Sequence, residues 1–231
     1  MGRIFLLSKR MNGKKLCPSR LKLFIRVGLS LCLLFILSFG LPFDFTLINW
    51  AYKGHTYKSS FIAGLLTNLG SPTVLLSLTL LCGGLLLTIG RKSLALFLCL
   101  NILGVSVLNE GVKQVVRRSP VVLVSVYQPA PEVFNKALVI PSPKFTQVVY
   151  AFPSGHAAGS ASVFLALNMF VKRKRWRWIT TYGGGLLVLL IGFSRIYLGA
   201  HTLSDVLGGW TLAYAFFSLL SEIPRFTKAY F

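Results

Sequence analysis

The chain has 231 residues, of which 54% are hydrophobic and only 13% charged, with a mean hydropathy of +0.69. This composition is too apolar for an ordinary soluble domain and indicates an integral membrane protein. The net charge of +20 excludes no class by itself, but the basic residues are not interleaved with aromatic residues on a polar surface, so we expect no nucleic acid as a partner.

Six apolar segments come near the ~20 residues that a helix needs to cross a bilayer. In chain order they are Phe24–Leu41, Ser71–Ile89, Leu94–Glu110, Ser154–Val171, Ile179–Leu198 and Leu203–Leu220. The sequence therefore predicts an all-α fold in which residues 24–222 form one bundle of six transmembrane helices. A basic segment, residues 1–23, precedes the bundle, and a short tail, residues 223–231, follows it.

Most basic residues lie in alternate connections between these segments. They are Arg3, Lys9, Arg10, Lys14, Lys15, Arg20, Lys22, Arg26, Arg91, Lys92, Lys172, Arg173, Lys174, Arg175, Arg177, Arg225 and Lys228. With six spans, all of these residues fall on the same side of the membrane, which the positive-inside rule identifies as the cytoplasm. We therefore expect both termini to be cytoplasmic.

Two histidine-bearing clusters stand at the ends of the predicted spans. The first, Pro153–His156, opens the fourth span, and the second, Ser194–Asp205, joins the fifth to the sixth. His201 and Asp205 are four residues apart, so on a helix they share a face and the carboxylate can hold the imidazole in one tautomer. This arrangement can make a histidine a nucleophile.

The neighbouring residues suit the binding of an oxyanion. Arg195 offers a guanidinium fork for phosphate oxygens, Ser154 a hydroxyl and Gly155 an unhindered N–H near a helix start. His156 lies at the same helix start, where it can protonate a leaving oxygen as a general acid. The pattern predicts cleavage of a phosphate ester in which His201 attacks phosphorus and His156 protonates the leaving group.

These clusters resemble the type 2 phosphatidic acid phosphatase superfamily, the lipid phosphate phosphatases, whose three motifs are K-x6-R-P, P-S-G-H and S-R-x5-H-x3-D. The second and third motifs match without a mismatch, and the resemblance extends over about Leu108–Trp210. It implies a six-helix membrane phosphatase that needs neither a metal nor another cofactor. The roles that it implies are nucleophile for His201, its orienter for Asp205, general acid for His156, and phosphate ligands for Lys113, Ser154, Gly155 and Arg195.

The first motif departs from the family pattern, because Pro120 stands where the family has its arginine, seven residues after Lys113. We expect Arg118 to replace the missing phosphate ligand, since a small shift of this loop would bring its guanidinium to the site. Arg117 is the less favoured alternative. The outer loop that carries this motif is expected to comprise residues 113–152.

The later part of this loop, residues 121–152, is apolar and contains Pro129, Pro131, Pro141 and Pro143, which disfavour a spanning helix. Two interpretations remain open for it. It can form a wall or lid beside the lipid tail of a substrate, or it can be a connecting loop that rests on the bilayer.

With six spans, all three motifs lie near the outer face of what resembles a bacterial plasma-membrane protein. We expect hydrolysis of a lipid phosphate or pyrophosphate there through a phosphohistidine. The candidate substrates are undecaprenyl pyrophosphate, phosphatidylglycerophosphate, phosphatidic acid and the lipid A phosphates, and the expected partners are this substrate and membrane lipids. The alternatives are a silent scaffold, a phosphotransferase and a lipid phosphate transporter. The oligomeric state is not readable from the sequence.

Overall fold

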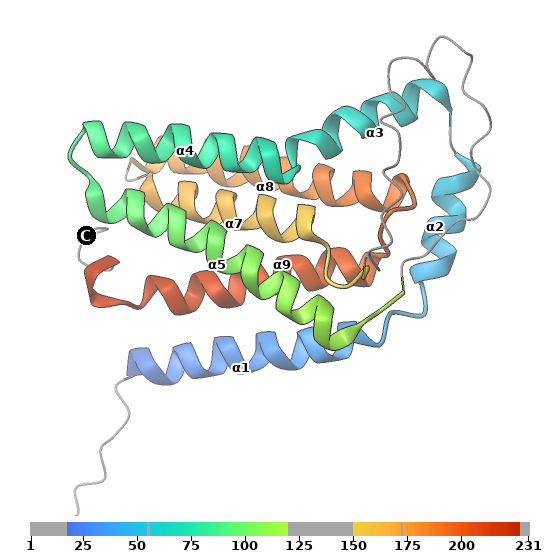
Figure 1. Ribbon diagram of the computed structural model, residues 1–231, viewed down its shortest axis with the longest axis horizontal. Coiled ribbons are helices and arrows are strands. Elements are labelled where there is room, and N and C mark those ends of the chain that lie inside the picture. The colour runs from blue at the N-terminus through green and yellow to red at the C-terminus, as the bar shows by residue number, and fades with distance from the viewer. Residues whose placement is uncertain (1–17, 55, 120–149, 172, 227–231) are drawn as a thin grey trace, which may run out of the picture.

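In the described part of the chain, six long helices run side by side along the molecule (Figure 1). The structure is a computed structural model that describes residues 18–54, 56–119, 150–171 and 173–226. The long helices are α1 (Pro18–Ser38), α4 (Pro72–Thr88), α5 (Lys92–Val116), α7 (Gly155–Phe170), α8 (Lys174–Tyr197) and α9 (Leu203–Ser221). A helix therefore lies at each of the six predicted ranges, and the described residues contain no strand.

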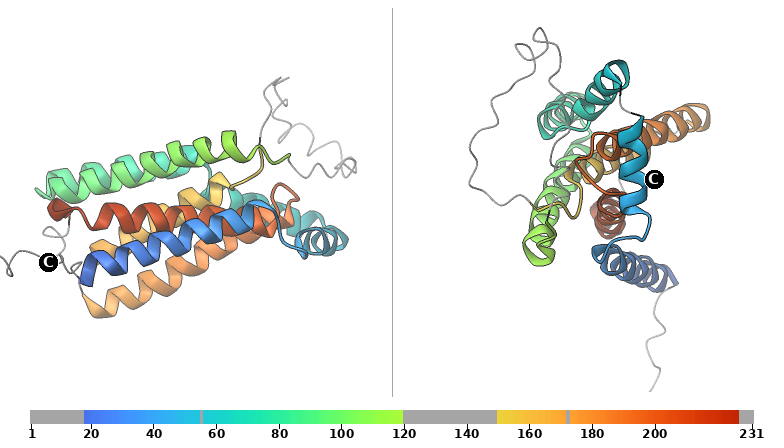
Figure 2. Two further views of the ribbon diagram at one scale, coloured as in Figure 1. Left: turned by 90° about the horizontal axis from the view of Figure 1, so that it is seen from below. Right: turned by 90° about the vertical axis from the view of Figure 1, so that its right-hand side faces the viewer.

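Helix α7 lies at the centre of the bundle, where it packs on α4, α5, α8 and α9, while α1 packs on the far side of α9 (Figure 2). Small side chains on α7, among them Ala157, Ala158 and Ala161, are buried and let these neighbours approach closely. Asn101 of α5 ties the two helices together, because its Nδ2 donates to Ser162 Oγ at 2.7 Å and to Ser162 O at 2.9 Å.

Two shorter helices, α2 (Asp44–Lys53) and α3 (Tyr57–Leu69), close one end of the bundle (Figure 1). The sequence analysis did not predict them. Thr56 caps α3 in a capping box with Ser59, and Ser71 caps α4, which begins with a proline, as is common at a helix start. Helices α3 and α4 are bent by 43° across this break.

The helices have the length and surface of a membrane protein. In the described part of the chain, α5, α8 and α9 are each long and apolar enough to cross a bilayer, and the bent pair of α3 and α4 makes up to a fourth span. Large apolar side chains are exposed along the outward faces of α1, α4 and α8, including Phe24, Leu29, Phe35, Leu80, Leu81 and Leu186. The count of six spans stays a prediction.

Several predictions concern residues that the structure does not describe. Residues 1–17 of the basic segment, most of the predicted lid or loop (120–149) and the last residues of the tail (227–231) lie outside the described ranges. Within the described ranges, the start of the predicted outer loop differs from the structure. Lys113 lies in the last turn of α5 and not in a loop, because the helix continues to Val116.

Candidate active site

The three motifs meet at the end of the bundle where α5 ends and where α7 and α9 begin. Two backbone hydrogen bonds connect them: Ala151 N donates to Arg118 O, and Ser154 N donates to Asp205 O, both at 2.9 Å. The first bond joins the segment after motif one to the segment before motif two, and the second joins motif two to motif three. Residues that are distant in sequence thus form one site.

Motif two forms the N-terminus of α7. Ser154 is the N-cap residue, yet its side chain makes no capping hydrogen bond, and its Oγ is buried without a partner among the described residues. Gly155 begins the helix, and a Cβ on it would lie 3.5 Å from Asn109 Nδ2. The first turn of α7 therefore presents free N–H groups and a free hydroxyl, which is the arrangement that binds anions at helix starts.

Motif three is held by the start of α9. Thr202 and Asp205 form a capping box, in which Thr202 N donates to Asp205 Oδ2 at 2.9 Å and Asp205 N donates to Thr202 Oγ1 at 3.2 Å. The preceding residue, His201, places its Nδ1 3.6 Å from the same Asp205 Oδ2. This distance is slightly longer than a hydrogen bond, as is common for catalytic pairs without a bound ligand.

The surroundings of His201 keep its imidazole neutral. Burial lowers the pKa of His201, Asp205 opposes this shift, and the nearby charges of Arg195 and Lys113 lower the pKa further. With Nδ1 turned toward the Asp205 carboxylate, the proton of the neutral ring is expected on Nδ1. Nε2 then carries the free electron pair that a nucleophile needs.

Two of the three predicted phosphate-binding cations, Arg195 and Lys113, come from different helices. Arg195, near the end of α8, donates from Nη1 to Thr67 Oγ1 of α3 at 2.9 Å, while its buried Nε has no described partner. Lys113 is largely buried and lies 3.8 Å from Glu110 Oε2 one turn earlier on α5. Both cations act electrostatically on both histidines, so all four groups share one site.

Arg118 lies differently from the other predicted phosphate ligands. Its Nη1 donates to Asp205 Oδ1 and to Ser204 Oγ, both at 2.7 Å, and its guanidinium stacks over the Phe152 ring at 5.3 Å. Arg117, the alternative, is exposed, and its Nε donates to Gln114 O of its own helix at 2.9 Å.

Several residues that were not predicted from the sequence lie beside the motifs. Thr67 holds Arg195, Asn109 contacts the start of α7, and Asp44 accepts a hydrogen bond from Ser204 N at 2.9 Å. Asn109 carries a local signal, because it lies one turn before Lys113 on the same helix face. The contacts that bring Thr67 and Asp44 to the site are tertiary, so no local sequence signal marks them.

Unpartnered polar atoms gather at this site. In the described part of the chain, six buried side-chain N or O atoms have no hydrogen-bond partner, and three of them belong to predicted site residues: Ser154 Oγ, Arg195 Nε and His201 Nδ1. Asn109 Oδ1, near Gly155, is a fourth. Because buried polar groups are normally paired, this concentration indicates a place for a polar ligand.

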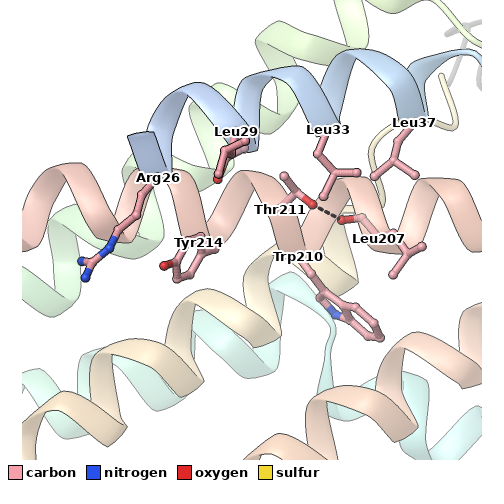
Figure 3. A pocket seen from close by; sticks show the side chains of 9 residues that line it. Arg26, Leu29, Leu33, Leu37, Leu207, Trp210, Thr211 and Tyr214 are labelled. Atoms are coloured by element: carbon pink, nitrogen blue, oxygen red, sulfur yellow. Dashed lines mark hydrogen bonds between the residues drawn. The ribbon is translucent and has the colours of Figure 1, made fainter. Parts of the chain in front are cut away.

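A separate groove of about 480 Å³ lies between α1 and α9 (Figure 3). Its walls run from Arg26 to Leu37 on α1 and from Leu207 to Tyr214 on α9, and they are mostly apolar. None of its lining residues belongs to the predicted catalytic or phosphate-binding set, so we assign it no part in the chemistry.

A bundle of apolar helices with two histidines, an aspartate and several cations gathered at one end has the features of a membrane-bound phosphatase. The sequence profile of the PAP2 superfamily matches residues 93–228, which is more than half of the chain. The chain therefore belongs to the PAP2 superfamily.

Two relatives agree with this assignment. Phosphatidylglycerophosphatase B of Bacillus subtilis (strain 168) is 34% identical over 91 residues, which cover 34% of this chain and 43% of that protein. Undecaprenyl-diphosphatase of Sulfolobus acidocaldarius is 35% identical over 63 residues, which cover 27% of this chain and 28% of that protein. The chain thus matches less than half the length of either relative.

The fold is similar to a solved structure. The crystal structure of the first transmembrane PAP2 type phosphatidylglycerolphosphate phosphatase from Bacillus subtilis aligns with a TM-score of 0.69 at 21% identity, over 85% of this chain and 94% of that one. This likeness confirms the predicted all-α membrane fold.

Proposed function

We propose that this protein is a lipid phosphate phosphatase that works through a phosphohistidine without a metal ion. The observation that carries the proposal is the convergence of His201, His156, Arg195 and Lys113 at the open start of α7. Family membership and the names of the two relatives support a phosphatase acting on lipids.

In the first half of the reaction, His201 Nε2 attacks phosphorus in line with the leaving oxygen. The new N–P bond forms as the P–O bond to the lipid breaks, and His156 gives its proton to the departing oxygen. Asp205 orients the attacking ring and stabilises the positive charge that develops on it.

The equatorial phosphate oxygens require positive charge and N–H donors as the transition state forms. We assign this role to Lys113, Ser154, Gly155 and Arg195. In the second half, water attacks phosphorus, the N–P bond breaks, and the now neutral His156 accepts the proton of the water. Inorganic phosphate leaves and both histidines return to their starting states.

The proposed substrates are lipid phosphates or pyrophosphates, with phosphatidylglycerophosphate and undecaprenyl pyrophosphate to be tested first. The names of the two relatives support these two, and phosphatidic acid and the lipid A phosphates complete the set. In a bundle that presents apolar side chains outward, such substrates can reach the site from the surrounding bilayer.

The proposed site faces outward from the cytoplasm. Helix α1 begins, α4 ends and α8 begins at the end of the bundle opposite the site (Figure 1). The basic pairs Arg91-Lys92 and Lys174-Arg175 lie at these helix ends, and the positive-inside rule favours the cytoplasm for them.

Labelling of intact cells with a membrane-impermeant maleimide tests this orientation. Lys58→Cys, at the site end, is expected to react, and Arg175→Cys, at the other end, to react only after lysis, because both side chains are exposed. The reverse pattern would contradict the proposed orientation.

Phosphate release by the purified protein tests the function itself. The four lipid phosphates are supplied in detergent with EDTA present, beside the His201→Ala variant and a matched His55→Ala control. We expect release that survives EDTA and is lost only in His201→Ala, with an acid-labile phosphoprotein trapped in the wild type. If no phosphate were released from any of the four lipids, the alternative of a catalytically inactive membrane scaffold would be favoured.

A further inference from the structure

The guanidinium of Arg118 is bound to the side chains that support the nucleophile. Its Nη1 contacts Asp205 Oδ1 and Ser204 Oγ at 2.7 Å each, and its Nη2 lies 3.4 Å from Leu37 O of α1. The Phe152 ring covers its plane. These contacts use three of the five N–H donors of the guanidinium, including both of Nη1, so the Nη1 side of Arg118 is committed to Asp205 and Ser204.

The two carboxylate oxygens of Asp205 have different partners. Oδ2 faces His201 and accepts from Thr202 N, whereas Oδ1 accepts from Arg118. Asp205 is fully buried. The capping box fixes the backbone position of Asp205, and Arg118 fixes the rotation of its carboxylate. This rotation determines the direction from which Oδ2 faces the imidazole of His201.

The support extends one residue further. Ser204 Oγ accepts from Arg118 and donates to Asp44 Oδ2 at 2.5 Å, and Asp44 Oδ1 accepts from Ser204 N at 2.9 Å. Asp44 also accepts from Leu41 N at 2.9 Å, which places it firmly at the start of α2. Arg118, Ser204 and Asp44 thereby join the ends of α5, α9 and α2 around Asp205.

Charge gives a second reason why this arginine is held here. Asp205 and Asp44 are 0% and 3% exposed, and burying a carboxylate without a partner is costly. Among the described residues, Arg118 is the one Lys or Arg that forms an ion pair with either carboxylate. It therefore offsets negative charge that the site needs behind His201.

We propose that Arg118 is a positioning residue that orients Asp205 behind the nucleophile, with Ser204 and Asp44 completing its support, and that it does not bind the substrate phosphate. This inference rests on the proposed function. The two cations of motif one then have different roles: Lys113 binds phosphate, and Arg118 acts through Asp205.

The two roles differ in what a substitution changes. We expect Arg118→Ala to lower kcat about 100-fold, the loss that follows a misplacement of reacting groups by about 1 Å. Its inhibition constant for inorganic phosphate should stay within about twofold of the wild type, whereas Arg195→Ala should raise that constant at least tenfold. Arg117→Ala removes the same charge from the neighbouring exposed residue and should change neither quantity.

A double-mutant cycle shows whether Arg118 acts through Asp205. Side chains that work as a unit are not additive, so Arg118→Ala should cost less than about threefold in kcat once Asp205→Asn is present. Losses that multiply, or a raised inhibition constant for phosphate in Arg118→Ala, would overturn the inference. Thermal unfolding of each variant in detergent shows that it is folded.

Two milder variants keep the inference testable if Arg118→Ala does not fold. Arg118→Lys, which keeps the charge but not the fork, should recover part of kcat, and Ser204→Ala should lower kcat with phosphate inhibition unchanged. The inference would be overturned if Ser204→Ala kept the wild-type kcat and Arg118→Lys raised the inhibition constant for inorganic phosphate. A wild-type protein that releases no phosphate would instead overturn the proposed function.

Discussion

Gly209 is the position where the packing of two helices most directly determines the geometry of the site. It lies on α9, and a Cβ built on it would be 2.5 Å from Ser154 O and 3.0 Å from Ala158 N of α7. Both are backbone atoms, which cannot rotate away as a side chain can. Gly209→Ala must therefore move the start of α7 away from α9.

The size of this movement follows from the contact. The Cβ and Ser154 O reach ordinary contact at 3.4 Å, so they must separate by about 0.9 Å. The hydrogen bond from Ser154 N to Asp205 O, now 2.9 Å, lies across the same interface. A displacement of about 1 Å between reacting groups costs on the order of 100-fold in rate. Overpacking costs about 1–3 kcal/mol of stability, and the higher helix propensity of alanine offsets about 1 kcal/mol of that.

Turnover of a short-chain lipid phosphate and thermal unfolding in detergent are measured for Gly209→Ala beside Gly183→Ala. Gly183 is a matched control, because it also lies in a helix but has no heavy atom within 4 Å of its Cβ position. We expect kcat to fall about 100-fold with a lowered Tm in Gly209→Ala, and unchanged kcat with an equal or higher Tm in Gly183→Ala. Wild-type kcat in Gly209→Ala would refute the link between this close approach and catalysis.

Three further predictions concern single groups. Thr67→Val removes the acceptor of Arg195 Nη1 and should raise the inhibition constant for inorganic phosphate severalfold, whereas Thr79→Val, which loses only a bond within its own helix, should not. Because burial lowers the pKa of His201 and the neutral ring attacks, the acidic limb of kcat/KM should have its midpoint below the ordinary value of 6.5; a midpoint above 6.5 would contradict this. Asn101→Leu should lower stability by up to about 2 kcal/mol while keeping activity, and an unchanged Tm would show that its bonds to α7 contribute nothing.

The sequence predicted the long helices well because their apolar length is a local property. Each of the six apolar runs largely coincides with a helix, and motif two lies at a helix start. Motif three instead runs from the last turn of α8 to the first turn of α9, and His201 lies before α9, so it does not share a helix face with Asp205 as their spacing predicted. The predicted span at α5 was too short, because the helix continues past Glu110 to Val116 and includes Lys113. Helices α2 and α3 were missed because, at 10 and 13 residues, each is too short to cross a bilayer by itself.

The supporting contacts could not be predicted, because they join residues far apart in sequence. Arg195 meets Thr67 across 128 positions, Arg118 meets Asp205 across 87, and Asp44 meets Ser204 across 160. One local signal was available: a threonine followed three residues later by an acidic residue marks a capping box. Thr202 and Asp205 have this spacing, which is enough to place Asp205 at the third position of α9 and to fix its backbone.

A phosphatase that uses histidines without a metal ion depends on side chains held in place before the substrate arrives. In this chain two groups of the proposed site lie at helix ends and are held from elsewhere in the bundle: Arg195 at the end of α8 by Thr67 of α3, and Asp205 at the start of α9 by Arg118 beyond the end of α5. Helix ends carry the free N–H groups that an anion needs, but they are also where helices fray. Contacts from neighbouring helices therefore supply the rigidity that the helix ends lack, and substitutions at those contacts should alter turnover although they touch no substrate.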